Sequence, residues 1–276
     1  MEKNGLQIRD RVLTVTPQGA SWTLAAFAGP GLGAPPTPAV AAALAAAHPD
    51  LMLLLGDLGD RPATAKATLA ALATVPAPTL LVGGGRDTPA RIADAIAALR
   101  AGTERIIDAT GLREVRLGSD TLIPVAGALD GRYAVEERAC GYALEDLKRL
   151  AKEVAGGPGR RWLIGWEAPG LGGVSSVSRT DQGVDVGSPA LAQLGMRLGA
   201  PGGLFAWPHV QAGRPTSTGG NSRLAAGEPA KDFQLVVPRL SGPAVERADG
   251  SMLPSGFALL RLDSSGLALA ALRELP

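Results

Sequence analysis

The stretch Leu51-Met52-Leu53-Leu54-Leu55-Gly56-Asp57-Leu58-Gly59-Asp60 joins a continuous apolar run to a short turn that carries two carboxylates. Five consecutive apolar residues that stop at a glycine are typical of a central parallel strand, which is buried on both faces. The stretch therefore predicts an α/β sheet whose strand 51–55 places Asp57 in the loop at its carboxyl end. In open α/β sheets, such loops hold the ligand and catalytic sites.

Helix-like and strand-like segments alternate on both sides of this run. A hydroxyl residue can cap a helix whose first turn begins with proline, so helices are predicted to start at Thr37-Pro38, Thr88-Pro89 and Ser188-Pro189. Leucine spacing predicts a further amphipathic helix over 144–154, and another helix is predicted over 62–74. The predicted strands are 22–27, 51–55, 79–82, 106–107, two strands within 114–125 joined by a turn at 118–120, 162–165, 203–207, 233–237, 256–262 and 267–272.

This order of segments predicts a layered α/β fold with helices outside and two packed sheets inside. After Gly213 the pattern contains strands only. We expect a single domain over residues 1–276, with a polar N-terminal extension at 1–18 and a β-rich C-terminal part of the same domain at 214–276.

Composition narrows the function classes. The chain is 46% hydrophobic and carries a net charge of +1, without a basic cluster long enough to follow a nucleic-acid backbone. The longest apolar stretch is about half of what a spanning helix needs, and no signal-peptide pattern is present, so we expect no membrane insertion and a cytoplasmic location. Cys140 is the only cysteine, which excludes an intramolecular disulfide and a Cys-based zinc cluster. High Ala, Gly and Arg content indicates a GC-rich bacterial genome.

Five loops that follow predicted strands resemble, in order, the signature loops of the calcineurin-like metallophosphoesterase family. Residues 53–60 match the family's apolar strand and G-D-x-x-D box. Leu81-Val82-Gly83-Gly84-Gly85-Arg86-Asp87 stands where the family has G-N-H-D or G-N-H-E. Residues 162–169 resemble the strand that ends in a metal-binding His, and 206–212 occupy the place of G-H-x-H. The resemblance covers residues 20–265 and implies a four-layer sandwich of two packed mixed β-sheets flanked by helices.

The same resemblance implies that most metal ligands are lost. Active members bind two divalent metals through a bridging Asp, several His and one Asn, and the metals activate water and neutralise phosphoryl oxygens. The bridging Asp57 is retained. The replaced positions are Ala28 and Pro30 in the first loop, Gly85 and Arg86 in the third, and Trp166 in the fourth.

The fifth loop aligns in two registers. In one register, Trp207 replaces the first His and His209 keeps the second; in the other, Pro208 and Val210 replace both. The whole chain has two His, and the other, His48, ends a predicted surface helix. We therefore expect no metal, no other cofactor and no phosphoester hydrolysis.

Three functions follow from this interpretation. The first is a catalytically inactive scaffold for protein interaction or regulation, whose partner is another protein. The second is a module that binds a phosphate or nucleotide ligand through Arg86, Asp57 and loop amides. The third is a residual single-metal phosphoesterase that uses Asp57, Asp87, Asn221 and His209. The sequence leaves the partner and the oligomeric state open.

The candidate pocket or interface comprises Asp57, Asp60, Arg86, Asp87, Trp166, Trp207 and His209. Asp57 is either a surviving ligand or a strand-end carboxylate that accepts from loop amides, and the loss of its co-ligands favours the second. Asp60 and Asp87 either form a polar pocket or cap the helices that start near Pro62 and Pro89; capping is favoured.

The replacement residues also allow two interpretations each. Arg86 either lies between Asp57 and a neighbouring acid, where it would offset the cost of a buried charge, or points into solvent. Trp166 and Trp207 either fill the former pocket or form an exposed aromatic patch for a partner, and filling is the default for aromatics at strand ends.

Overall fold

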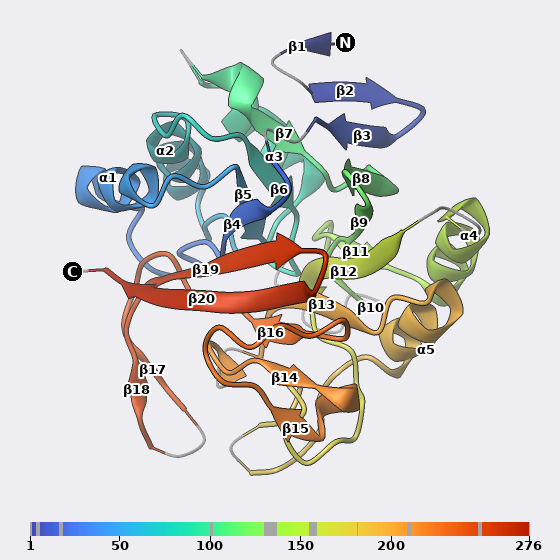
Figure 1. Ribbon diagram of the computed structural model, residues 1–276. Coiled ribbons are helices and arrows are strands. Elements are labelled where there is room, and N and C mark those ends of the chain that lie inside the picture. The colour runs from blue at the N-terminus through green and yellow to red at the C-terminus, as the bar shows by residue number, and fades with distance from the viewer. Residues whose placement is uncertain are drawn as a thin grey trace.

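The computed structural model describes residues 2–3, 6–16, 19–99, 102–129, 137–154, 159–180, 182–208, 211–247 and 250–275. Two large sheets lie at its centre (Figure 1). The six-stranded sheet has the order β20 (Gly266–Glu274), β19 (Gly256–Asp263), β4 (Trp22–Phe27), β5 (Leu51–Leu55), β6 (Thr79–Val82) and β7 (Ile106–Asp108).

The ten-stranded sheet is mixed as well. Its order is β1 (Glu2–Lys3), β2 (Leu6–Arg9), β3 (Val12–Val15), β8 (Glu114–Leu117), β9 (Asp120–Val125), β12 (Arg160–Glu167), β13 (Gly202–Trp207), β16 (Gln234–Val236), β14 (Thr216–Ser217) and β15 (Ser222–Arg223). Two small pairs complete the strands: β10 (Ala128–Leu129) with β11 (Gly141–Tyr142), and β17 (Val245–Glu246) with β18 (Met252–Leu253).

The helices cover the outer faces of the sheets. They are α1 (Pro38–Ala46), α2 (Pro62–Leu72), α3 (Pro89–Ala97), α4 (Leu144–Val154) and α5 (Pro189–Leu198), with short 3-10 turns η1 (Thr103–Arg105) and η3 (Thr218–Gly220). Figure 1 shows α1 and α2 on one side of the molecule and α4 and α5 on the other. Within the described ranges, no helix is both long enough and apolar enough to cross a bilayer.

Three apolar cores separate the four layers. The first lies between the sheets and includes Leu53 of β5 and Ile164 of β12. The second lies between the six-stranded sheet and α1, α2 and α3, and the third between the ten-stranded sheet and α4 and α5. The fold is the expected metallophosphoesterase-like sandwich of two mixed sheets flanked by helices.

Strand β5 shows why its sequence is apolar throughout. Leu53 and Leu55 face the core between the sheets, whereas Met52 and Leu54 face the core under the helices, and every residue of the strand is buried. Alternate residues of a strand point to opposite faces, so a strand between two cores has no position for a polar side chain.

Proline starts the predicted helices, but the caps differ. The Thr88 and Ser188 hydroxyls accept from the amides of Arg91 and Leu191 at 3.1 and 3.3 Å. Thr37 precedes Pro38 with extended backbone but makes no side-chain cap bond, so that capping prediction is wrong. Proline's fixed φ defines the start of α1 without a cap.

Residues in the N-terminal extension join the larger sheet. β2 and β3 form an antiparallel hairpin, and β3 continues in parallel with β8. Leu13 and Val15 are buried and bring this hairpin into the core between the sheets. The main strands behind the loops of interest are parallel: β4 with β5 and β6, and β9 with β12, β13 and β16.

Candidate functional site

The signature loops converge where these parallel strands end. The Gly29 amide donates to the Gly56 carbonyl at 2.9 Å, and the Gly31 amide donates to the Asp57 carbonyl at 2.9 Å. On the facing sheet, the Ala168 amide donates to the Trp207 carbonyl at 3.1 Å. The loops that the carboxyl-end rule for α/β sheets selects therefore lie together in the structure.

Asp57 and Trp166 form the centre of this cluster. The Asp57 side chain is buried and its backbone is left-handed, with φ of 57°. The Trp166 indole Nε1 donates to Asp57 Oδ1 at 3.0 Å. Trp166 is 2% exposed and stacks on half-buried Trp207 with ring centroids 5.8 Å apart.

Glycines make room for the indole. A Cβ added at Gly56 or Gly84 would lie 2.6 Å from Trp166 Cδ1, and one at Gly85 would lie 3.1 Å from Cζ3. Gly85 stands where the resemblance implies an Asn ligand, and Trp166 where it implies a His. The two positions are therefore in contact, because a side chain at position 85 would meet the six-membered ring of the Trp166 indole.

Asp87 does not cap α3, contrary to prediction. Its carboxylate is buried and accepts from the amides of Leu58 and Gly84 at 3.0 and 2.8 Å. Burial, and next the charge of Asp57, raise the pKa of Asp87 to about 7. Thr88 takes the capping role because its hydroxyl directly precedes the helix.

Asp60 is not a cap either. Arg61 occupies the N-cap of α2 without a side-chain cap bond, and Asp60 Oδ2 lies 3.6 Å from Arg61 Nε. The Arg61 side chain is 81% exposed, so this ion pair adds little to stability. Asp60 therefore lies at the rim of the cluster, outside the group around Asp57.

Arg239 is the cation that sequence reasoning missed. Burial lowers the pKa of Arg239, and the charge of Asp57 opposes that shift. Hydrogen bonds from Ala28 to Pro238 and from Leu240 to Ala28 hold it beside the first replaced position. Arg239 follows a strand parallel to β13, so the carboxyl-end rule, applied to one more strand, could have found it.

The described residues do not support the first of the two interpretations of Arg86, in which it lies between Asp57 and a second acid. Among the described residues it forms no ion pair, so they do not place it between Asp57 and a second acid. Its side chain is half-buried, its backbone carbonyl accepts from Arg91 Nη1 at 2.9 Å, and its charge acts on Arg239.

The residues present do not fit a pair of divalent metals. Within the described part of the chain, no three His, Cys, Asp or Glu side chains are grouped to hold a metal ion. Ala28, Pro30, Gly85 and Trp166 offer no oxygen or imidazole ligand. His209 and Val210 lie outside the described residues, so neither register of the fifth loop is decided there.

Two other ionisable side chains lie near these loops, and both are buried: Glu167 and Cys140. Glu167 is buried and accepts from the Tyr142 hydroxyl at 2.6 Å and the Leu129 amide at 3.0 Å. Burial, and then the nearby carboxylates, raise the pKa of the Cys140 thiol to about 12. A thiol with so high a pKa forms almost no thiolate at neutral pH.

Solved structures share this fold. One crystal structure is 14% identical, with a TM-score of 0.62 over 93% of this chain and 100% of its own. TT1561 of Thermus thermophilus is 16% identical, with a TM-score of 0.52 over 89% and 96% of the two chains. GAP50, the anchor in the inner membrane complex of Plasmodium, is 11% identical, with a TM-score of 0.50 over 90% and 83%.

Comparisons of the sequence with protein-family models and with curated proteins find no match. At these low identities the structural likeness shows the fold alone, which is a metallophosphoesterase-like α/β sandwich.

Proposed function

We propose that this chain is a catalytically inactive, degenerate member of the calcineurin-like metallophosphoesterases that serves as a scaffold for protein interaction or regulation. The observation that carries the proposal is the buried Trp166 indole, which donates to Asp57 and fills the space against Gly56, Gly84 and Gly85. The indole N–H donates to Asp57 Oδ1, an oxygen that would be needed as a ligand if this carboxylate bridged two metals. Because the apolar cores of the fold are retained while this site is filled, we infer that selection has preserved the shape of the protein rather than a catalytic activity.

The phosphate-binding alternative is less well supported. It requires loop amides and a cation that are available to an anion. The Leu58 and Gly84 amides already donate to the Asp87 carboxylate. The buried Asp57 carboxylate beside these amides would also repel a phosphate.

Metal content and turnover test the loss of catalysis. Protein purified without chelators is analysed for bound metals and assayed with p-nitrophenyl phosphate and bis-p-nitrophenyl phosphate. We expect substoichiometric metal and no turnover above a blank. Stoichiometric metal with turnover that Asp57→Ala abolishes, and that the rim variant Asp60→Ala preserves, would refute the proposal.

A capture experiment tests the scaffold role. Half-buried Trp207 provides the accessible edge of the tryptophan stack, so it is the residue of the centre best placed to contact a partner. We expect the wild-type chain to retain a specific protein in stoichiometric amount from a bacterial lysate. A thermal-shift screen with nucleotides and sugar phosphates, in which a specific ligand raises the melting temperature, would instead favour the ligand-binding alternative.

A cytoplasmic location is part of the proposal, since the single cysteine is a buried thiol.

A further inference from the structure

A cavity of about 520 Å³ lies beside α5, and none of its lining residues belongs to the Asp57 centre. Leu163 and Phe205 line it from the ten-stranded sheet, and Leu191, Ala192, Gly195 and Met196 line it from α5. Its volume falls within the roughly 300–1,000 Å³ that is usual for small-molecule sites, which are mainly apolar with a few placed polar groups.

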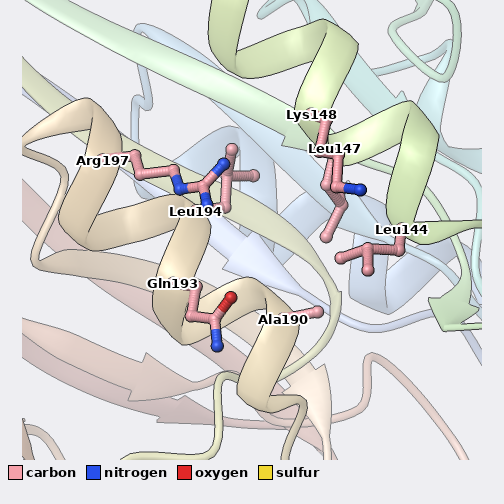
Figure 2. A pocket seen from close by; sticks show the side chains of 7 residues that line it. All are labelled: Leu144, Leu147, Lys148, Ala190, Gln193, Leu194 and Arg197. Atoms are coloured by element: carbon pink, nitrogen blue, oxygen red, sulfur yellow. The ribbon is translucent and has the colours of Figure 1, made fainter.

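Helix α5 separates this cavity from the contact with α4. Figure 2 shows Ala190, Gln193, Leu194 and Arg197 turned toward α4, where only about 60 Å³ of space remains. The residues that line the larger cavity belong to another face of the same helix. One face of α5 is therefore closed by helix packing, whereas the other leaves an unfilled volume.

Gln234 supplies a polar group in this apolar lining. Its neighbour Leu235 faces the core between the sheets and Val236 faces the outer core, so strand alternation places Gln234 on the outer face. Gln234 is 1% exposed, and its Nε2 donates to the Pro201 carbonyl at 2.8 Å. That bond fixes the orientation of the amide, because the nitrogen must face the carbonyl.

The other amide atom lacks a partner. Within the described ranges, Gln234 Oε1 is buried and accepts no hydrogen bond, and the hydroxyl of its cross-strand neighbour Thr216 is in the same state. Buried acceptors without donors are rare and unfavourable in folded proteins. Because Oε1 is fully buried, a ligand's donor would reach and satisfy it when the Gln234 side chain turns toward the cavity that this residue lines.

We propose that this cavity binds a mostly apolar, uncharged small molecule with one hydrogen-bond donor, a hydroxyl or an amide N–H, which donates to Gln234 Oε1. The described lining contains no charged side chain, so an ionised carboxylate or phosphate would lose hydration without gaining a counter-charge. Met196 is 75% exposed and lies at the entrance. The proposal does not depend on the function of the Asp57 centre.

Binding is measured with N-phenyl-1-naphthylamine, a neutral fluorescent probe with one N–H donor, and by its displacement. We expect one probe per chain. We expect 1-decanol to displace it on the order of tenfold better than 1-methoxydecane, which matches its apolar chain but lacks the donor. Equal displacement by the alcohol and the ether, or no saturable probe binding, would overturn the proposal. This comparison uses the unmodified chain and requires no variant to fold.

Variants locate the site. Ala192→Phe places a ring in the cavity and should weaken probe binding at least about tenfold, whereas Gln193→Phe, on the α4-facing side of the same helix, should leave it unchanged. Gln234→Leu should remove the preference for the alcohol over the ether. Unchanged binding in Ala192→Phe with a cooperative melt, or an intact preference in Gln234→Leu, would exclude this cavity.

Discussion

The Asp57 centre and the α5 cavity are opposites. The centre lies at the recognisable sequence motifs, yet the Trp166 ring fills it and its carboxylates have donors. The α5 cavity takes only Leu163 and Pro169 from a signature stretch, yet it leaves about 520 Å³ unfilled and includes an acceptor without a partner in the described residues. The stretches that carry the resemblance thus coincide with a filled centre, whereas the unfilled volume beside α5 indicates a different place where a ligand can bind.

The largest expected effect comes from emptying the filled centre. Trp166→Ala should lower the free energy of unfolding by roughly 3–5 kcal/mol, because it opens a cavity in the core and removes the donor to Asp57. Urea unfolding followed by circular dichroism measures the loss. Trp207→Ala, at the half-buried member of the stack, should cost less. A loss below about 1 kcal/mol for Trp166→Ala would show that the indole is not a packing element.

The buried carboxylate of the centre should make stability depend on pH. The pKa of Asp87 is raised from 3.8 to about 7, so between these values the folded state binds more protons than the unfolded state. Stability is therefore highest below pH 4 for this group and falls as pH rises to about 7, by roughly 4 kcal/mol at most. Asp87→Asn should flatten this fall in urea unfolding across pH 4–8, and Asp60→Asn should not. An unchanged pH slope in Asp87→Asn would contradict the prediction.

A third test asks whether the glycine and the indole act as a pair. Gly85→Asn should destabilise the fold by roughly 1–3 kcal/mol, because its Cβ would crowd the Trp166 ring. In the double variant with Trp166→His the smaller ring makes room, so the total loss should be less than the sum by about 1 kcal/mol. A double-mutant cycle in urea measures this coupling, and strict additivity would show that the replacements are independent.

The smallest effect is expected at the open cavity. Without ligand, Gln234→Leu should leave the free energy of unfolding unchanged or raise it by up to about 1 kcal/mol, because it removes a buried acceptor without a partner. Gln211→Leu is the matched control. Its amide donates to Arg179 and accepts from Arg223, so that variant should lose roughly 1–3 kcal/mol. Equal losses for both glutamines would remove the contrast between the two regions.

Local sequence signals predicted the layers well. The apolar run 51–55 and the proline-started helices have the expected positions, since burial on two faces and the fixed φ of proline are properties of a few adjacent residues. The N-terminal strands β2 and β3 escaped prediction because pairing with β8, about a hundred residues along the chain, stabilises them.

The site was predictable only in part, for the same reason. The resemblance singles out positions 28, 30, 85 and 166, but their contacts come from distant segments. Arg239 lies outside every motif, and the role of Asp87 is decided by the Leu58 amide rather than by the helix that follows it. The α5 cavity had no sequence signal, because it results from how α5 packs on the sheet.

The six-stranded sheet has a consequence for synthesis on the ribosome. β4, at residues 22–27, lies between β5 and β19, yet β19 spans 256–263. During translation, one edge of this apolar strand therefore stays unpaired until nearly the whole described chain has been made. Such an edge can pair with other chains, so nascent chains truncated before β19 should be recognised by chaperones or aggregate.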